Sequence, residues 1–243
     1  YPDDFYPKGI ESMLDNAELW SGNPMATGLP SIPRKILNMP VPVTELNNHN
    51  NAIFYLNLAV DVDGKTCSPS NPPSPQVWQS YENVVYGREY FSSNHPDKIV
   101  LQYWFFYPFN NWWNNHEGDW EMIQIILDNN TEIPEGATYA YHHGGETFQW
   151  EDIDKIEDKI TGEKTHPKVF VARGSHASYA TPGTRYFKVI KLLKLKRFPD
   201  ERTANEIALY PERVESWLLE NVVSQQKYKL ISIPPTCLLY TSD

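Results

Sequence analysis

The densest group of residues able to do chemistry lies between Leu101 and Leu127, in the segment LQYWFFYPFNNWWNNHEGDWEMIQIIL. Two apolar, strand-like stretches flank an Asn-rich loop, which ends in His116, Asp119 and Glu121. An imidazole and carboxylates held between hydrophobic strands are costly to desolvate unless something compensates them. A bound divalent cation is the simplest compensation, and a hydrogen-bonded polar cluster without metal is the alternative.

Strand geometry indicates how these groups are arranged. Side chains along a strand alternate between its two faces. A strand from Asp119 to Leu127 therefore places Asp119 and Glu121 on one face, with aliphatic residues deeper in the sheet, and Trp120 on the other face, where we predict it to be buried. Carboxylates suit Mg²⁺, Ca²⁺ or Mn²⁺, and the added imidazole of His116 also admits Zn²⁺ or Fe²⁺. The sequence predicts such a metal site at the open end of a β-sandwich or barrel.

Two further polar clusters stand at the ends of expected strands. His142 and His143 precede two glycines, and His143, at the strand exit, is the predicted fourth metal ligand; two surface histidines are the alternative. The second cluster, residues 174–179, contains Ser175 and His176. We predict that this strand exit comes near the His116 site. His176 would face that site as a ligand, a general base or a structural hydrogen-bonding group, and Ser175 would support it or contact the ligand. A serine hydrolase is disfavoured for two reasons. The adjacent Ser175 and His176 cannot easily form the hydrogen bond between nucleophile and base, and the G-x-S-x-G motif is absent.

These groups are compatible with three kinds of function. In a recognition module, Asn110, Trp112 and Trp113 would contact the ligand. In a metal-dependent hydrolase acting on a small polar or ester substrate, the cation would activate water and Glu117 or His176 would act as the base. In a structural module, the cluster would only fix its loop. The chain has no P-loop, dinucleotide-binding fingerprint or C-x-x-C pair.

Chain length and composition limit the number of domains and the kinds of partner. The 243 residues predict one domain, and a net charge of −10 argues against nucleic acid as a partner and against adsorption to anionic lipid by charge alone. No apolar run is long enough to cross a membrane, although peripheral contact remains open. Cys67 and Cys237 could form one disulfide or remain two thiols. The chain begins at Tyr1 without an initiator Met, so a processed, secreted protein is expected, with a cytoplasmic one as the alternative.

The fold predicted from the pattern is a mainly antiparallel β-sandwich with a few peripheral helices, because short, turn-bounded strands occur without regular alternation with helices. The expected strands are Ala52–Val60, Glu82–Tyr90, Ile99–Tyr107, Asp119–Leu127, Ala137–His142, Lys168–Ala172 and Lys229–Ile233. Residues 1–50 are expected to form an irregular wrap with a short helix at Ile10–Trp20, and residues 52–233 the sandwich core. A helical insertion is predicted at Thr203–Val222. The amphipathic segment Lys188–Arg197 is expected to pack its apolar stripe into the core, with a membrane-surface role as the alternative.

The motif His116-x-x-Asp119-Trp120-Glu121 resembles part of the central heptapeptide of necrosis- and ethylene-inducing-like proteins. The strand Trp104–Pro108 and the pair His143-Gly144 are similar to flanking segments of that family. The family consists of secreted β-sandwich cytolysins that bind a divalent cation and target sphingolipid head groups. The resemblance implies a β-sandwich, a divalent cation and a glycan or lipid head group as ligand. The family has an acidic metal ligand where this chain offers Asn110 or Asn111, and the loop here is shorter, so membrane lysis is not implied.

A longer resemblance, over roughly Ile99 to Tyr179, is to the vacuolar-protein-sorting-sixty-two-like domain. It rests on the same H-x-G-D-W-E motif and on H-P-x-V-x-V-A-x-G-S-H-A-x-Y, which runs here from His166 to Tyr179. Together the residues and the resemblances predict a metal-binding, toxin-like β-sandwich that recognises a glycan or lipid head group. A metalloenzyme and a structural module without metal are the alternatives.

Overall fold

The computed structural model describes residues 6–22, 34–48, 54–58, 78, 80–110, 112, 116–142, 144–157, 161–194, 203–215 and 229–232, with the backbone alone for 186–194 and 203–215. Over these residues the chain consists mostly of strands, with two short α-helices, α1 (Glu11–Leu14) and α2 (Val43–Asn48). The predicted fold class, a mainly antiparallel β-sandwich with a few peripheral helices, is confirmed.

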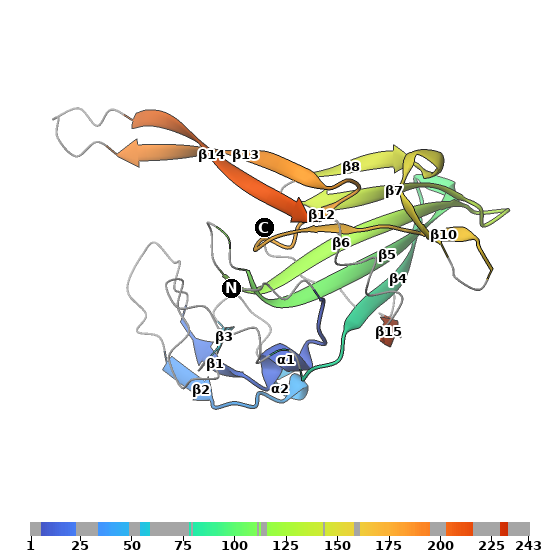
Figure 1. Ribbon diagram of the computed structural model, residues 1–243. Helices are drawn as coiled ribbons and strands as arrows, with labels where there is room; N and C mark the ends of the chain where they lie inside the picture. The colour runs from blue at the N-terminus through green and yellow to red at the C-terminus, as the bar shows by residue number, and fades with distance from the viewer. Residues whose placement is uncertain are drawn as a thin grey trace.

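A six-stranded sheet lies at the centre of the fold, with the strand order β15-β4-β5-β6-β7-β8 (Figure 1). Its strands are β4 (Val84–Ser92), β5 (His95–Asn110), β6 (His116–Asp128), β7 (Pro134–Tyr141), β8 (Gly144–Gln149) and β15 (Lys229–Ser232). The strands from β4 to β8 are antiparallel to their neighbours, whereas β15 pairs in parallel with β4. The strands expected in this part of the chain are therefore confirmed. The edge strand β8 was not expected, because its two glycines and exposed polar residues give no apolar alternation.

The second layer of the sandwich is made of shorter elements and one long hairpin. They are the 3-10 helix η1 (Trp150–Asp152), β9 (Lys155–Glu157), β10 (Lys164–Pro167), β11 (Phe170–Ala172), β12 (Ser178–Tyr179), β13 (Gly183–Lys194) and β14 (Thr203–Glu215). They form a two-stranded sheet, β10-β9, and a four-stranded sheet, β12-β11-β14-β13.

One face of the central sheet packs against this second layer and forms what we call the sandwich core. Its buried residues are Tyr107, Ile123, Ile125, Ala137, Tyr139, Ile153, Val169, Val171 and Ala180. The alternation predicted for β6 is confirmed, because Asp119, Glu121, Ile123 and Ile125 are buried while the residues between them are only partly buried. Burial of each large apolar side chain contributes about 1.5–3 kcal/mol to folding, so this face is a main source of stability.

The opposite face of the central sheet packs against the N-terminal part of the chain and forms the N-terminal core. Its buried residues are Met13, Ala17, Leu58, Trp78, Val84, Tyr86 and Phe106. Trp120, predicted to be buried on this face, packs against them but is only partly buried. Strands β1 (Ala17–Ser21), β2 (Arg34–Leu37) and β3 (Phe54–Leu58) form a small sheet in the order β2-β1-β3 below the central one (Figure 1). Strand β3 confirms the strand expected at Ala52–Val60 over its described residues.

Two expectations for the N-terminal region need correction. The helix predicted at Ile10–Trp20 is wrong beyond Leu14, because Ala17–Ser21 pairs with β3 in an antiparallel ladder instead. The region 1–50 is also more regular than expected, since its described residues contain two helices and two strands. Pairing with β3 satisfies the backbone hydrogen bonds of Ala17–Ser21. The local sequence pattern suggested a helix because it does not contain this distant partner.

The segment Pro7–Gly9 closes one end of the central sheet. The amide of Lys8 donates to the carbonyl of Phe106 at 2.8 Å, and the amide of Val84 donates to the carbonyl of Pro7 at 3.1 Å. The ammonium group of Lys8 is buried and donates to the side-chain oxygen of Asn83 at 2.9 Å. This segment therefore lies between the start of β4 and the far end of β5.

The helical insertion predicted at Thr203–Val222 is wrong for the residues that are described, because 203–215 form strand β14. It pairs with β13 in an unbroken register from Gly183↔Val214 to Lys194↔Thr203. The segment 188–194, expected to be a strand or helix with its apolar stripe in the core, is thus part of a strand, and the hairpin projects beyond the central sheet (Figure 1). The remaining parts of these two predictions, residues 195–197 and 216–222, lie outside the described residues, as do Cys67 and Cys237.

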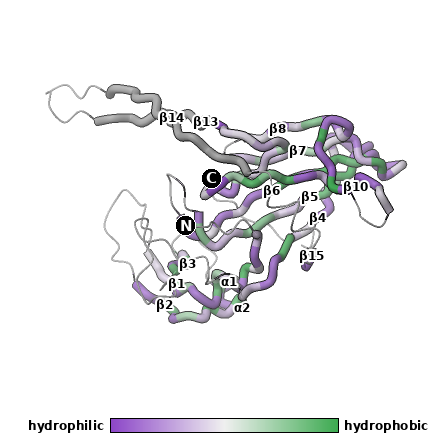
Figure 2. The backbone as a smooth tube through the Cα atoms, viewed as in Figure 1, coloured by the Kyte–Doolittle hydropathy of each residue, from purple (hydrophilic) through white to green (hydrophobic). Residues whose placement is uncertain are grey.

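Hydropathy along the backbone agrees with this arrangement. Hydrophobic residues recur along the central strands, whereas the described connections at the edge of the sandwich are mostly hydrophilic (Figure 2). None of the helices in the described part of the chain has the length and apolar character required to cross a membrane.

Candidate functional site

The carboxylate of Asp119 is the centre of a polar cluster at the end of β5 and β6 that faces the second layer. Its Oδ2 atom accepts a hydrogen bond from Asn110 Nδ2 at 3.0 Å and lies 3.0 Å from His176 Nδ1. Its Oδ1 atom lies 3.4 Å from His116 Nε2. Asp119, Asn110 and His176 are buried, whereas 40% of the His116 side chain is exposed. The buried Asp119 carboxylate therefore contacts three polar side chains, and of these His116 is partly exposed.

Gly118 decides which residues of β6 join this cluster. Its φ of +71° is a left-handed conformation that reverses the order in which side chains alternate. His116, opposite Asn110 in the register, therefore lies on the same side as Asp119. Glu117 turns to the other side of the sheet, where its Oε2 atom accepts a hydrogen bond from the amide of Leu58 at 2.6 Å. The structure thus places Glu117, a candidate general base, away from the cluster and in contact with β3.

Replacing Gly118 by Ala is expected to destabilise the fold by about 1–2 kcal/mol, because an L-residue is strained in the left-handed region. Space is not the cause, since an added Cβ would lie 3.8 Å from Phe106. Gly162→Ala is the matched control: its φ is +72° and nothing lies within 4 Å of the added atom. Both variants should lose similar stability in urea unfolding, but only Gly118→Ala should shift the NMR resonances of the His116 ring. A Gly118→Ala variant as stable as the parent would contradict this account.

The turn between β11 and β12 delivers His176 to the cluster. Gly174 and His176 both have positive φ, of 87° and 58°, and the amide of His176 donates to the carbonyl of Ala172 at 3.0 Å. The His176 ring is stacked on Tyr107, with ring centroids 4.1 Å apart and an interplanar angle of 7°. A non-glycine residue held in this conformation is strained, so the turn is maintained by its surroundings. The contacts of His176 with Asp119 and Tyr107 hold it in this conformation.

Ser175 supports the cluster through its backbone. Its carbonyl accepts a hydrogen bond from Asn110 Nδ2 at 3.3 Å, and its buried hydroxyl lies 3.5 Å from the amide of Ala177. Asn110 joins Asp119 to the Ser175 turn, and its predicted contact with a ligand stays a prediction. Glu121 is also buried and lies one step deeper than Asp119 on the same face of β6, opposite Phe105 in the register.

Aromatic side chains form the rim of the site. The amide of Trp112 donates to Asn110 Oδ1 at 3.1 Å, which fixes the start of the loop against the cluster. The Trp112 ring stacks on His142, with centroids 4.6 Å apart and an interplanar angle of 16°, and both residues are half-buried. His142 has a φ of 47°. Trp112 was predicted to contact the ligand, and His142 was not expected at the site because His143 was preferred as the metal ligand; Trp113 and His143 themselves lie outside the described residues.

The electrostatics of the two acidic residues differ. Burial raises the pKa of Asp119, but hydrogen bonds and positive charge from His116 and His176 outweigh burial, so its pKa lies below the usual value. Burial raises the pKa of Glu117, and the hydrogen bond from Leu58 only partly offsets this effect. Asp119 is thus kept ionised as an acceptor for imidazole and amide donors.

The donor set of the cluster suits a divalent cation chemically, but its geometry is that of a hydrogen-bonded cluster. Among the described residues, no three His, Cys, Asp or Glu side chains are arranged to hold a metal ion. Two ligand atoms that bind one ion at roughly 2.0–2.3 Å lie about 3 Å or slightly more apart. His116 Nε2 and Asp119 Oδ1, at 3.4 Å, meet this condition as a pair. The assignment of His116, Asp119, Glu121 and His143 as metal ligands stays a prediction.

Comparison with known proteins finds similarity over part of the chain. No family model matches. The chain is 37% identical over 101 residues to Vacuolar protein sorting-associated protein 62 of Saccharomyces cerevisiae, which is 35% of this chain and 21% of that protein. It is 33% identical over 104 residues to the Putative vacuolar protein sorting-associated protein TDA6 of the same yeast, which is 35% of this chain and 22% of that protein. The matches span about a fifth of the length of these relatives.

Solved structures with local similarity include Necrosis and Ethylene inducing Protein 2 from the causal agent of cocoa's Witches Broom disease, at 20% identity and a TM-score of 0.35, covering 51% of this chain and 59% of that one. NLPPya in complex with glucosamine has 20% identity and a TM-score of 0.34, covering 51% and 55%. The non-toxic HaNLP3 protein has 17% identity and a TM-score of 0.32, covering 72% and 65%. Both groups of proteins that the motifs resemble are thus among the similar proteins, at a structural likeness too low to transfer a ligand.

Proposed function

We propose that the protein is a recognition module that binds a polyhydroxylated head group, such as that of a glycan or glycolipid, at the rim formed by His116, Trp112 and His142. The observation that carries the proposal is the buried Asp119 carboxylate, which contacts the partly exposed His116 and also Asn110, the residue that accepts a hydrogen bond from the amide of Trp112 in the Trp112–His142 stack. A fixed hydrogen-bonding group next to an aromatic plane suits a ring that has both hydroxyl groups and an apolar face.

The burial of the cluster favours recognition over catalysis. His176, a candidate general base, is 3% exposed and its ring is covered by Tyr107 on one face. Glu117, the other candidate, bonds the amide of Leu58 on the opposite side of the sheet. A general base must reach the proton that it abstracts, directly or through one water molecule. A metal-dependent hydrolase is therefore the weaker of the two functions.

A divalent cation is part of the proposal. His116 and Asp119 would hold it, with Glu121, the next acidic residue on the same face of β6, and His143 as the further predicted ligands. Carboxylate and imidazole ligands of this kind admit Mn²⁺, Mg²⁺, Ca²⁺ or Zn²⁺. When bound, the ion would supply a positive charge toward which hydroxyl oxygens of the head group can turn. Secretion of the protein, expected from its sequence, is likewise a prediction.

Binding to vesicles tests this function. Phosphatidylcholine vesicles with and without a glycosylated sphingolipid are mixed with the protein in a co-sedimentation assay, in Mn²⁺ or Ca²⁺ and again in excess EDTA. We expect binding only to the glycosylated vesicles, with loss in EDTA. Trp112→Ala should weaken binding about tenfold or more, because truncation of an aromatic contact removes a large part of the binding energy.

Trp112→Phe is the matched control, since it keeps an aromatic plane beside His142 and should retain most of the binding. Equal binding to both kinds of vesicle, or full binding by Trp112→Ala, would contradict the head-group site. Binding that survives EDTA but is lost in Trp112→Ala would retain the head-group site and remove the cation from it.

A further inference from the structure

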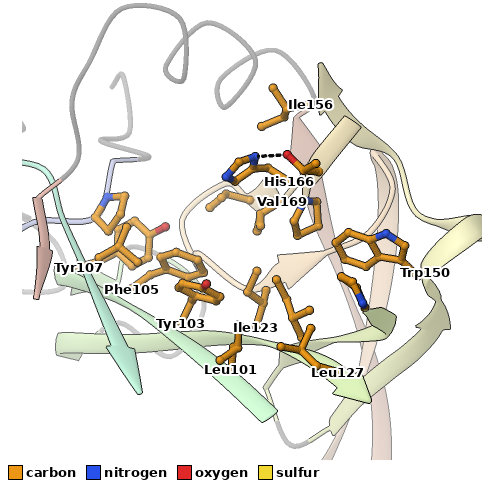
Figure 3. Close-up of a pocket in the computed structure, with 17 residues that line it drawn as sticks. Leu101, Tyr103, Phe105, Tyr107, Ile123, Leu127, Trp150, Ile156, His166 and Val169 are labelled. Atoms are coloured by element: carbon orange, nitrogen blue, oxygen red, sulfur yellow. Dashed lines mark hydrogen bonds between the residues drawn. The ribbon is translucent and has the colours of Figure 1, made fainter. Parts of the chain in front are cut away.

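An apolar pocket of about 540 Å³ lies between the central sheet and the second layer (Figure 3). Leu101, Tyr103, Phe105, Ile123 and Leu127 of β5 and β6 form its floor. Its other walls come from Trp150 of η1, Ile156 of β9, the β10 segment Thr165–Pro167 and Val169 before β11. In Figure 3 the labelled side chains of both layers point into the same space.

The floor of this pocket is a part of the sandwich core that the described residues of the second layer do not fully cover. Leu101, Tyr103, Phe105 and Leu127 are only partly buried, although they share a face with the fully buried Ile123. The hydroxyl groups of tyrosines are the only side-chain polar atoms that the central sheet contributes to the lining. An uncovered apolar hollow of this size is in the range of small-molecule sites, roughly 300–1,000 Å³, and marks a ligand rather than ordinary surface.

The open side of the pocket carries polar groups. Thr165 and His166 are exposed and line the pocket, and their side chains hydrogen-bond each other at 2.9 Å (Figure 3). The ammonium group of Lys155 lies over the ring of Trp150, 5.1 Å from its centroid. Lys155 pairs with Pro167 in the β9-β10 register, next to His166, so the cation and the imidazole stand on neighbouring strands.

We propose that this pocket binds one long-chain fatty acid, with the acyl chain on the apolar floor and the carboxylate at the mouth beside Lys155, Thr165 and His166. The donors at the mouth complement a carboxylate, and the floor is apolar apart from tyrosine hydroxyl groups. The volume suits on the order of a dozen methylene groups or more, taking for each roughly 30 Å³, the share of one water molecule in the liquid. This site is separate from the head-group site and does not depend on it; Tyr107 lies between them, lining the pocket and stacking on His176.

Displacement of the fluorescent fatty acid cis-parinaric acid from the whole chain tests this site. Saturated fatty acids of increasing length should compete about fourfold better for each added methylene until the pocket is filled. A long-chain alcohol of equal length should compete several-fold less well than the acid. Lys155→Gln should weaken binding of the acid about two- to fivefold and leave binding of the alcohol unchanged, as for a partly exposed charge pair.

Ile156→Trp, on the β9 wall, should reduce affinity tenfold or more by filling the space. Ile133→Trp is the matched control, because Ile133 is 62% exposed and lies outside the lining. Leu127→Trp is a second filling variant from the opposite wall, and circular dichroism checks that each variant is folded. Trp112→Ala should leave fatty-acid binding unchanged.

Three results would overturn the proposal: no chain-length dependence, full binding by both filling variants, or no displacement of parinaric acid at all. Equal competition by the acid and the alcohol would overturn the placement of the carboxylate. None of these results depends on whether glycosylated vesicles bind, so failure here and failure of the head-group site can be told apart.

Discussion

Asp119→Ala is expected to lower the free energy of unfolding by about 3–5 kcal/mol, the cost of removing one partner from a buried polar cluster. The variant leaves Asn110 Nδ2 and His176 Nδ1 without the oxygen that both contact at 3.0 Å, and it releases His116. Urea unfolding followed by circular dichroism measures the change. Asp152→Ala is the control, since Asp152 is exposed on η1 and should change stability by less than about 0.5 kcal/mol.

The pH dependence identifies the cause of this loss. The pKa of Asp119 in the folded protein lies below its usual value, so the ionised carboxylate adds stability that is fully present above an unfolded pKa of about 3.9. That stability is lost as the pH falls through the lower folded pKa. The difference in stability between the parent and Asp119→Asn should therefore be constant near neutral pH and shrink below about pH 4. A difference that stays constant into strong acid would show that the charge of Asp119 is not responsible.

Trp120→Ala is expected to cost about 3–5 kcal/mol through the cavity that it leaves in the N-terminal core. The Trp120 ring lies against Phe106, at a centroid distance of 4.9 Å, and meets Tyr86 edge to face at 5.3 Å. Trp120 lies within the motif His116-x-x-Asp119-Trp120-Glu121, yet it faces the opposite side of the sheet from Asp119. Thermal and urea unfolding measure the loss.

Trp112→Ala completes the comparison, since Trp112 is half-buried at the rim and stacks against His142. It should lose head-group binding with a much smaller change in stability, whereas Trp120→Ala should lose stability, and its folded fraction should still bind. A Trp120→Ala variant that is as stable as the parent but fails to bind would show that this residue serves the ligand.

Much of the central sheet follows directly from the sequence. Apolar residues at every second position of β6 predicted that Asp119 and Glu121 share a face with Ile123, and the burial pattern agrees. Periodicity of this kind is a local property, so it can be recognised from the sequence of β6 alone. The polar residues at the strand ends also indicated where a site would form, because neighbouring strands end at a common edge.

The composition of the cluster could not be derived in the same way. Strict alternation predicts that Glu117 accompanies Asp119 and that His116 faces away, and the left-handed backbone at Gly118 reverses both. A glycine between two acidic residues is a sign of such a reversal, but it does not state its direction. The contact of His176 with Asp119 joins two turns far apart in sequence; their positions at strand ends and the resemblance predicted that they meet, and the 3.0 Å distance from His176 Nδ1 to Asp119 Oδ2 confirms it.

The helix predicted at Thr203–Val222 failed for a related reason. Its helix-forming residues give a weak local preference, and pairing of β14 along the whole length of β13 overrides it. The strand at Ala17–Ser21 was missed in the same way, because its partner β3 lies in a part of the chain that a local window does not include.

The insertion of Pro7–Gly9 between the start of β4 and the end of β5 has a consequence for how the molecule is assembled. Residues 7–9 are synthesised before Phe106, whose carbonyl receives the amide of Lys8, and must wait for it before this hydrogen bond can form. Contacts this distant in sequence carry a large loop-closure entropy and slow the rate of folding. The end of the sheet that holds Asn110 and Asp119 should therefore be ordered late, and a nascent chain halted before β5 would expose the apolar residues of α1 to chaperones and to other chains.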